Sequence, residues 1–320
     1  MEKLVSIVAP MYNEEDTVDV FCTAVLEVFA GLRDRYKAEI LLVNDGSTDK
    51  TCEKMHAAQA ANPAEITVVD LSRNFGLEGA IHAGLSYAKG QAVVVMDADM
   101  QDPPHIIQNL LDEWEKGPDI VVARRVSRRH DGWLKRVTAS CFYRLLGSMS
   151  EKMTIEYNAA NFRLLSRRAV DALLGLEETN FIFRVMVPYL GMKTASVDYE
   201  RDRRYAGKTK YNLRSLFAYS LDGLTGASVV PLRKIFVAVP VSVALAVVFL
   251  VVFFLSPTEY KGYFFVSLVI SVFFIIAFIC LSVMAEYMAQ IFKEAKRRPV
   301  SVIYAYMPCG NAVRDEGPIS

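Results

Sequence analysis

Short apolar runs alternate with longer amphipathic stretches along the first 125 residues. The runs cover residues 4–9, 40–43, 66–69, 92–96 and 120–123. Their near-continuous apolar character is typical of strands that are buried on both faces of a parallel sheet. The stretches between them are long enough for crossover helices. The pattern therefore predicts a doubly wound α/β sheet.

Polar loops follow the first four of these runs. Their sequences are P-M-Y-N-E (10–14), N-D-G-S (44–47), S-R-N-F-G (72–76) and D-A-D-M-Q-D (97–102). In open α/β sheets, ligands bind at the carboxyl ends of the strands. Four consecutive polar loops at that edge predict a single cleft of nucleotide size.

The fourth loop offers two carboxylates one residue apart. Asp97 and Asp99 suit a hard divalent cation, Mg²⁺ or Mn²⁺, which can hold a diphosphate. Neither G-x-G-x-x-G nor G-x-x-x-x-G-K-[ST] occurs, so the phosphates must be neutralised by such a cation and by the basic residues in 201–211. Alternatively, Asp99 caps the helix that begins near Pro103 or Pro104, although capping alone leaves Asp97 without a role.

Two long segments without charged residues, 235–258 and 262–285, lie near the end of the chain. At about 1.5 Å per residue, either would exceed a hydrocarbon core of about 30 Å as a helix. They predict two membrane-spanning helices in a tight hairpin at Pro257. A pair of buried core helices is the alternative, but such helices keep a polar stripe, which Phe253–Phe254 and Phe273–Phe274 do not allow.

Basic residues flank both predicted spans, at 233–234 and 293–298. The positive-inside bias therefore predicts a multi-pass protein of the cell (inner) membrane with its catalytic domain in the cytoplasm. Further basic clusters at 124–136 and 201–214 suit an anionic lipid surface or a lipid phosphate, although solvated helix faces explain the first cluster equally well.

Cysteine and histidine show no ligand pattern in the sequence. The five cysteines form no C-x-x-C pair and no metal-ligand spacing, as expected in a reducing compartment. The four histidines are interpreted as ordinary surface or packed residues. The sequence thus predicts no metal site of this type.

The set of motifs resembles the membrane-bound family 2 glycosyltransferases, of the type of dolichyl-phosphate mannose synthase and bacterial undecaprenyl-phosphate glucosyltransferase. It comprises S-I-V-A-P-M-Y-N-E-E, V-N-D-G-S-T-D-K-T, L-S-R-N-F-G, D-A-D-M-Q-D-P-P, N-F-R-L-L-S-R-R, R-Y-A-G-K-T-K-Y, P-L-R at 231–233 and the terminal hairpin. The resemblance covers nearly the whole chain. It implies a GT-A type fold and inverting transfer of a sugar from a nucleotide diphosphate sugar, with uridine favoured, to polyprenyl phosphate.

The resemblance also implies roles for individual residues. Donor binding is expected at Pro10, Tyr12, Glu14, Asp45, Asn74, Asp97, Ala98, Asp99, Arg204 and Lys210. Metal coordination is expected at Asp97, Asp99 and Gln101, and catalysis at Asp99, Asp102, Asn161 and Arg163. Tyr12 could equally be a packed aromatic residue, and Asp102 could lie near the reacting carbon or cap the following helix.

Asn161 stands where relatives often have an aspartate that serves as a proposed base. An amide cannot accept a proton at neutral pH, whereas a phosphate monoester, with a second pKa of about 6, needs no base. Asn161 with Arg163 therefore favours a phosphate acceptor over a hydroxyl acceptor. Other departures are Asn44, Leu77 and F-I-F-R-V-M at 181–186, of which the last two could alter sugar choice.

The predicted organisation has four parts. These are a cytoplasmic GT-A domain (1–222), a juxtamembrane segment (223–234), two transmembrane helices (235–285, at about 235–256 and 262–285) and a cytoplasmic helix and tail (286–320). The amphipathic segment 131–149 is predicted to lie in the membrane interface or to pack on the sheet domain.

The expected partners are a nucleotide sugar, polyprenyl phosphate and membrane lipid, with no nucleic acid, while homo-oligomerisation is left open. Two rival functions remain at this point: a transferase of the same fold that acts on a sugar hydroxyl, and a non-catalytic membrane scaffold that binds nucleotide sugars.

Overall fold

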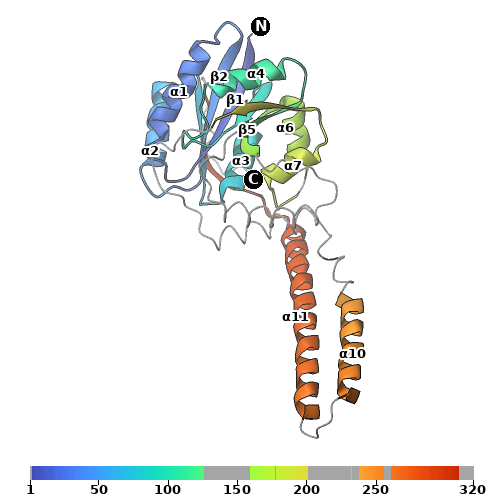
Figure 1. Ribbon diagram of the computed structural model, residues 1–320. Coiled ribbons are helices and arrows are strands. Elements are labelled where there is room, and N and C mark those ends of the chain that lie inside the picture. Colours follow the sequence, from blue (N-terminus) through green and yellow to red (C-terminus); the bar gives the residue numbers. More distant parts are fainter. Residues whose placement is uncertain are drawn as a thin grey trace. The chain divides into compact units, whose positions relative to one another are not determined.

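The computed structural model describes residues 2–125, 159–176, 178–200, 232, 238–255 and 261–309. Most of them form an eight-stranded mixed sheet with helices on both faces (Figure 1). The order across the sheet is β7-β5-β6-β4-β1-β2-β3-β8. The sheet and its helices are one compact unit, which includes residues 298–309, while α10 and α11 belong to a second unit.

The strands are β1 (Lys3–Met11), β2 (Tyr36–Asn44), β3 (Ile66–Leu71), β4 (Ala92–Val95), β5 (Ile120–Arg125), β6 (Ala159–Ser166), β7 (Thr194–Tyr199) and β8 (Ile303–Met307). The helices are α1 (Val18–Ala30), α2 (Thr51–Ala61), α3 (Leu77–Tyr87), α4 (Ile106–Trp114), α6 (Arg167–Leu174), α7 (Phe183–Tyr189), α10 (Ala238–Leu255) and α11 (Lys261–Ala295).

The parallel core of the sheet agrees with the predicted α/β class. β1 pairs in parallel with β2 and β4, and β2 pairs in parallel with β3. β5 runs in the same direction but does not pair with β4, because β6 lies between them and is antiparallel to both. β8 adds an antiparallel strand beside β3. The apolar pattern of the sequence did not predict either antiparallel strand.

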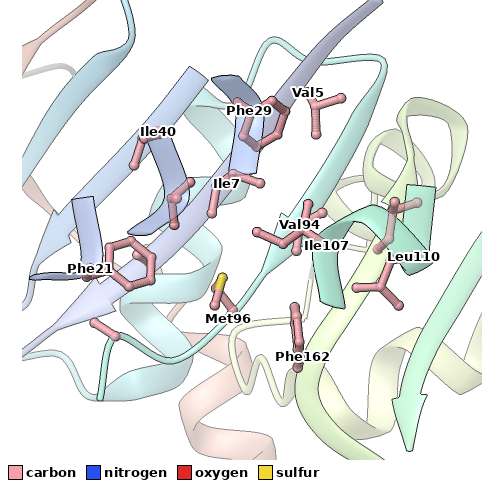
Figure 2. Close-up of a cluster of buried hydrophobic side chains, with 14 of the residues drawn as sticks. Val5, Ile7, Phe21, Phe29, Ile40, Val94, Met96, Ile107, Leu110 and Phe162 are labelled. Carbon is pink, nitrogen blue, oxygen red and sulfur yellow. The ribbon is translucent and has the colours of Figure 1, made fainter. Parts of the chain in front are cut away.

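Two apolar layers hold the helices to the sheet, because successive side chains of a strand point to opposite faces. Ile7 of β1 lies in the layer under α1 and α4, with Phe21 and Leu110, as Figure 2 shows. The neighbouring Val8 faces the other layer, under α3, α6 and α7. Phe162 of β6 extends the first layer and is fully buried.

The apolar segments near the end of the chain form α10 and α11, which pack together through an edge contact between Phe249 and Phe265. Among the described residues, one segment, Leu268–Ala295, is long and apolar enough to cross a membrane, and the apolar part of α10, Pro240–Val251, is shorter. α11 continues unbroken to Ala295, ten residues past the predicted end of the second span at 285.

The continuation of α11 differs from the predicted organisation, in which the second span ends at 285 and a cytoplasmic helix follows from 286. The sequence has no glycine or proline between residue 285 and Pro299, so nothing in it interrupts the helix. The helix ends where Arg297 adopts a positive φ of 46°. The predicted segments 131–149 and 223–234 lie, apart from Leu232, outside the described residues.

Gly84 allows α3 to approach the sheet closely. A Cβ at this position would lie 2.3 Å from Val8 Cγ1 and 3.0 Å from Val43 Cγ2. We expect Gly84→Ala to lower the free energy of unfolding by about 1–3 kcal/mol through overpacking, measured by thermal or denaturant unfolding in detergent. Gly31→Ala is the matched control, because φ is −76° there and the nearest atom would be 3.5 Å away. Equal stability of the two variants would contradict this expectation.

Candidate active site

The first two polar loops are joined by hydrogen bonds at the carboxyl edge of the sheet. The Asp45 backbone N–H donates to the Met11 carbonyl at 2.9 Å. The Asn13 side-chain oxygen accepts from the Thr48 N–H at 2.8 Å, and the Asn13 N–H donates to the Ser47 hydroxyl at 3.0 Å. Asn13 has a positive φ of 51°, a conformation that asparagine tolerates better than most residues. The loops after β1 and β2 therefore form one surface.

Asp45 joins the third loop to this surface. Its carboxylate is 3% exposed and accepts from the backbone N–H groups of Phe75 at 2.6 Å and Gly76 at 3.0 Å. Burial raises the pKa of Asp45, and these N–H groups oppose that rise. Gly46 permits the close approach: φ is +65°, and a Cβ there would lie 2.5 Å from the Arg73 carbonyl carbon. Asp45, one of the predicted donor-binding residues, thus orients the S-R-N-F-G loop.

Three carboxylates follow β4 within six residues. Asp99 and Asp102 are buried and Asp97 is half-buried. The pKa of Asp97 is raised, chiefly by burial and then by the charges of Asp102 and Asp99. Asp99 accepts from the backbone N–H of Gln101 at 3.1 Å, which fixes its orientation. Clustered carboxylate oxygens, whose repulsion a cation would relieve, fit Mg²⁺ or Mn²⁺.

β6 brings Asn161 and Arg163 to the same edge. Arg163 pairs with Val95 in the β4–β6 register, directly before the D-A-D-M-Q-D loop. Asn161 is 1% exposed, and its Oδ1 accepts from the Arg184 Nε at 2.7 Å. Its Nδ2 has no partner within standard hydrogen-bond geometry, although the Asn161 side chain and the Arg184 charge both lower the pKa of Asp97. Asn161 therefore presents its amide donors towards Asp97.

Arg184 is a site residue that the sequence analysis missed. It lies on α7 and is exposed, and its Nε donates to Asn161. The segment 181–186 was singled out as unusual, but nothing local to it indicates which of its residues reaches β6. Arg163, by contrast, is 3% exposed, with its guanidinium 5.7 Å from the ring centre of Phe183.

Asp102 is held inside the protein rather than presented to the edge. It is fully buried and accepts from the Tyr199 hydroxyl at 2.5 Å and from Arg125 Nη2 at 3.4 Å. Burial and the neighbouring Asp102 raise the pKa of Tyr199, so the phenol stays protonated as a donor. His105, not Asp102, is the N-cap residue of α4. The contacts of Asp102 are those of a residue that positions the loop.

The remaining predicted residues are distributed as follows. Pro10 and Ala98 are buried, and Tyr12, Glu14 and Gln101 are half-buried beside the loops. Glu14 donates its backbone N–H to the Thr51 hydroxyl at 2.7 Å, and Asn74 Oδ1 accepts from the Gly76 N–H at 3.1 Å. Arg204 and Lys210 lie outside the described residues.

The fold and the candidate site indicate a glycosyltransferase. Comparison with known proteins gives the same class of enzyme. The model of glycosyl transferase family 2 matches residues 6–174. An uncharacterized glycosyltransferase of Synechocystis is 37% identical over 93% of this chain and 94% of its own length. A bactoprenol glucosyl transferase of Shigella phage SfV is 36% identical over 93% of this chain and 97% of its own length. The chain belongs to glycosyl transferase family 2.

Solved structures with related folds include glucosyl-3-phosphoglycerate synthase of Mycobacterium tuberculosis in complex with Mn²⁺ and UDP-glucose. It is 19% identical, with a TM-score of 0.45, and the match covers 68% of this chain and 75% of that one. Mannosyl-3-phosphoglycerate synthase of Rubrobacter xylanophilus is 22% identical, also with a TM-score of 0.45, over 69% and 71% of the two chains.

The buried pair of Tyr199 and Asp102 generates a stability prediction. Tyr199→Phe removes one donor from a fully buried carboxylate, so we expect the free energy of unfolding to fall by about 1–3 kcal/mol. Tyr304→Phe is the control, since Tyr304 is 76% exposed and its hydroxyl can bond to water. The measurement is denaturant unfolding of both variants. The expectation fails if Tyr199→Phe has the same free energy of unfolding as the parent protein.

Proposed function

We propose that this glycosyltransferase moves a sugar, with inversion, from a uridine diphosphate sugar to undecaprenyl phosphate at the cytoplasmic face of the cell membrane. The observation that carries the proposal is its similarity to bactoprenol glucosyl transferases over 93% of this chain, which includes the apolar helices as well as the sheet domain. Similarity limited to the donor-binding loops would not indicate which acceptor the enzyme uses.

Donor binding is assigned to the joined loops after β1, β2 and β3, with Pro10, Tyr12 and Glu14 beside the nucleoside. Arg204 and Lys210 are assigned to the diphosphate. Asp97, Asp99 and Gln101 would hold Mg²⁺ or Mn²⁺. When bound, this cation would neutralise the charge that develops on the leaving diphosphate.

The acceptor side is assigned to β6 and α7. Nε of Arg184 can only donate, so Oδ1 of Asn161 is occupied and its two amide hydrogens face the site. Nδ2 carries two donor hydrogens, so an acceptor phosphate oxygen would accept from one while the other serves Asp97. Arg184 and Arg163 would add positive charge for the same oxygens. The phosphate acts as nucleophile without a base because it is largely dianionic at pH 7.

This arrangement favours a phosphate over a sugar hydroxyl as acceptor. A hydroxyl would require a carboxylate base near the acceptor, and residue 161 is an asparagine. Asp102 is fully buried and already accepts from Tyr199 and Arg125. We assign it a positioning role in place of a base.

The course of the chain supports a two-helix membrane anchor. β8 follows α11 and pairs with β3, so the chain returns to the unit that holds β1 to β7. If α11 crosses a membrane, a second crossing must precede it, since one folded sheet cannot lie on both sides. α10, with 18 residues and a length of about 27 Å at about 1.5 Å per residue, approaches a core of about 30 Å.

The direct test is transfer of labelled sugar from a panel of UDP- and GDP-sugars to purified undecaprenyl phosphate. We expect labelled lipid from one donor with Mg²⁺ or Mn²⁺, and loss of product with chelator or in Asp99→Asn. The matched control is Asp112→Asn, on the exposed side of α4, where the carboxylate pairs with Arg35. It should retain full activity.

A parallel reaction with undecaprenol replaces the lipid phosphate by an alcohol. Product from the phosphate alone supports the proposal. Product from the alcohol or from sugar hydroxyls would establish the rival transferase, and donor binding without transfer to any acceptor would establish the scaffold.

Arg184 generates a separate prediction. Arg184→Ala removes a charge-assisted hydrogen bond worth about 1.5–3 kcal/mol, so kcat/KM should fall by roughly 10- to 150-fold. The loss should appear in KM for the lipid phosphate, with KM for the donor unchanged, and Arg184→Lys should restore part of it. Arg168→Ala is the control, because Arg168 pairs with Asp119 at the amino end of β5. A rise in the donor KM instead would contradict the assignment.

A further inference from the structure

Three metal-binding side chains converge outside the carboxylate site. Cys52 and His56 lie one turn apart on one face of α2, and Asp70 lies near the end of β3. The donor atoms of the three residues all lie within 4.8 Å of one another, and within the described part of the chain this is the one group of three Cys, His, Asp or Glu residues that does so. Asp97, Asp99 and Asp102 are thus more widely spaced.

The distances within this group approach those of a tetrahedral site. Cys52 Sγ lies 3.7 Å from His56 Nε2 and 3.5 Å from Asp70 Oδ1, and His56 Nε2 lies 2.8 Å from Asp70 Oδ2. A tetrahedral Zn²⁺ with ligand bonds of about 2.0–2.3 Å separates its donors by roughly 3.3–3.5 Å. A movement of about 0.5 Å by the histidine or the carboxylate would therefore widen the distance from His56 Nε2 to Asp70 Oδ2 enough for both atoms to bind the ion.

We propose that Cys52, His56 and Asp70 bind one Zn²⁺ ion, with water as the fourth ligand. A thiolate, an imidazole and one carboxylate suit a borderline cation such as Zn²⁺, whereas Mg²⁺ and Mn²⁺ prefer oxygen ligands alone. Cys52 and His56 are only partly buried, which leaves a path for the ion and room for water. This proposal does not depend on the identity of the sugar or of the acceptor.

Asn44 orients the Asp70 carboxylate through a hydrogen bond. It pairs with Asp70 in the β2–β3 register, and its Nδ2 donates to Asp70 Oδ1 at 3.0 Å. Such a bond orients a carboxylate ligand and is typical of the shell around a metal site. Oδ1 of Asn44 accepts from the Ser47 N–H at 3.0 Å, so the ion would also stabilise the loop that carries Asp45.

A hydrogen-bond network is the alternative account of the same residues. In it, Asp70 accepts from Asn44, from His56 and from the Cys52 thiol. A thiol is a weak donor, so this residue adds little to a network, whereas it is a strong zinc ligand once deprotonated. Burial and Asp70 raise the pKa of Cys52 to about 11 in the absence of metal, so zinc binding must release the thiol proton.

The test uses the full chain in detergent, stripped with chelator and then supplied with excess Mg²⁺ to compete for the carboxylate site. We expect one Zn²⁺ per chain after desalting, by elemental analysis, and a thiolate-to-metal charge-transfer band with Co²⁺. Cys52→Ser and His56→Gln should lose the band and at least about tenfold in Zn²⁺ affinity. Cys309→Ser and His105→Gln are the matched controls and should keep both.

Thermal unfolding separates loss of the site from loss of the fold. Zn²⁺ should raise the Tm of the parent chain and of Cys309→Ser but not that of Cys52→Ser, whose metal-free Tm should equal that of the metal-free parent. Absence of the cobalt band in the parent chain, or its persistence in Cys52→Ser, would overturn the proposal and leave a hydrogen-bond network. All these readouts are independent of transferase activity.

Discussion

The concentration of negative charge after β4 is the constraint around which the site is arranged. Asp97, Asp99 and Asp102 lie within six residues, and because the last two are buried their like charges repel strongly. Residues from other parts of the chain offset this repulsion. The positive charge of Arg184 lowers the pKa of Asp97, and Arg125 and Tyr199 donate hydrogen bonds to Asp102. A divalent cation at Asp97 and Asp99 would complete the compensation.

β6 runs antiparallel to β4 and β5, and its position in the sheet divides the carboxyl edge into two halves. On one side, the loops after β1, β2 and β3 are held together by Asp45, whose carboxylate bonds to the backbone at Phe75 and Gly76. On the other side, β6 supplies Asn161 and Arg163, and α7 supplies Arg184. The carboxylate loop lies between the halves in chain order and in the sheet. This division is the basis of the proposal that the donor binds in one half and the acceptor in the other.

Two metal sites of different chemistry on one edge would not compete for the same ion. The loop after β4 offers oxygen atoms alone, which suit Mg²⁺ or Mn²⁺, while Cys52, His56 and Asp70 offer sulfur, nitrogen and oxygen. Asn44 links the second group to the N-D-G-S loop. In the proposal, an ion bound there would stabilise the N-D-G-S loop that carries Asp45.

Local pattern was sufficient for much of the fold and for the position of two candidate site residues. The runs that became β1 to β5 are apolar because they are buried on both faces, and Asp97 and Asp99 lie beside the strand that positions them. Composition alone predicted the apolar helices α10 and α11. The insertion of β6, the pairing of β8 with β3, the contact of Arg184 with Asn161 and the meeting of Cys52 and His56 with Asp70 were decided only by the tertiary structure. These features depend on the register between segments that are distant in the chain, which no local periodicity encodes.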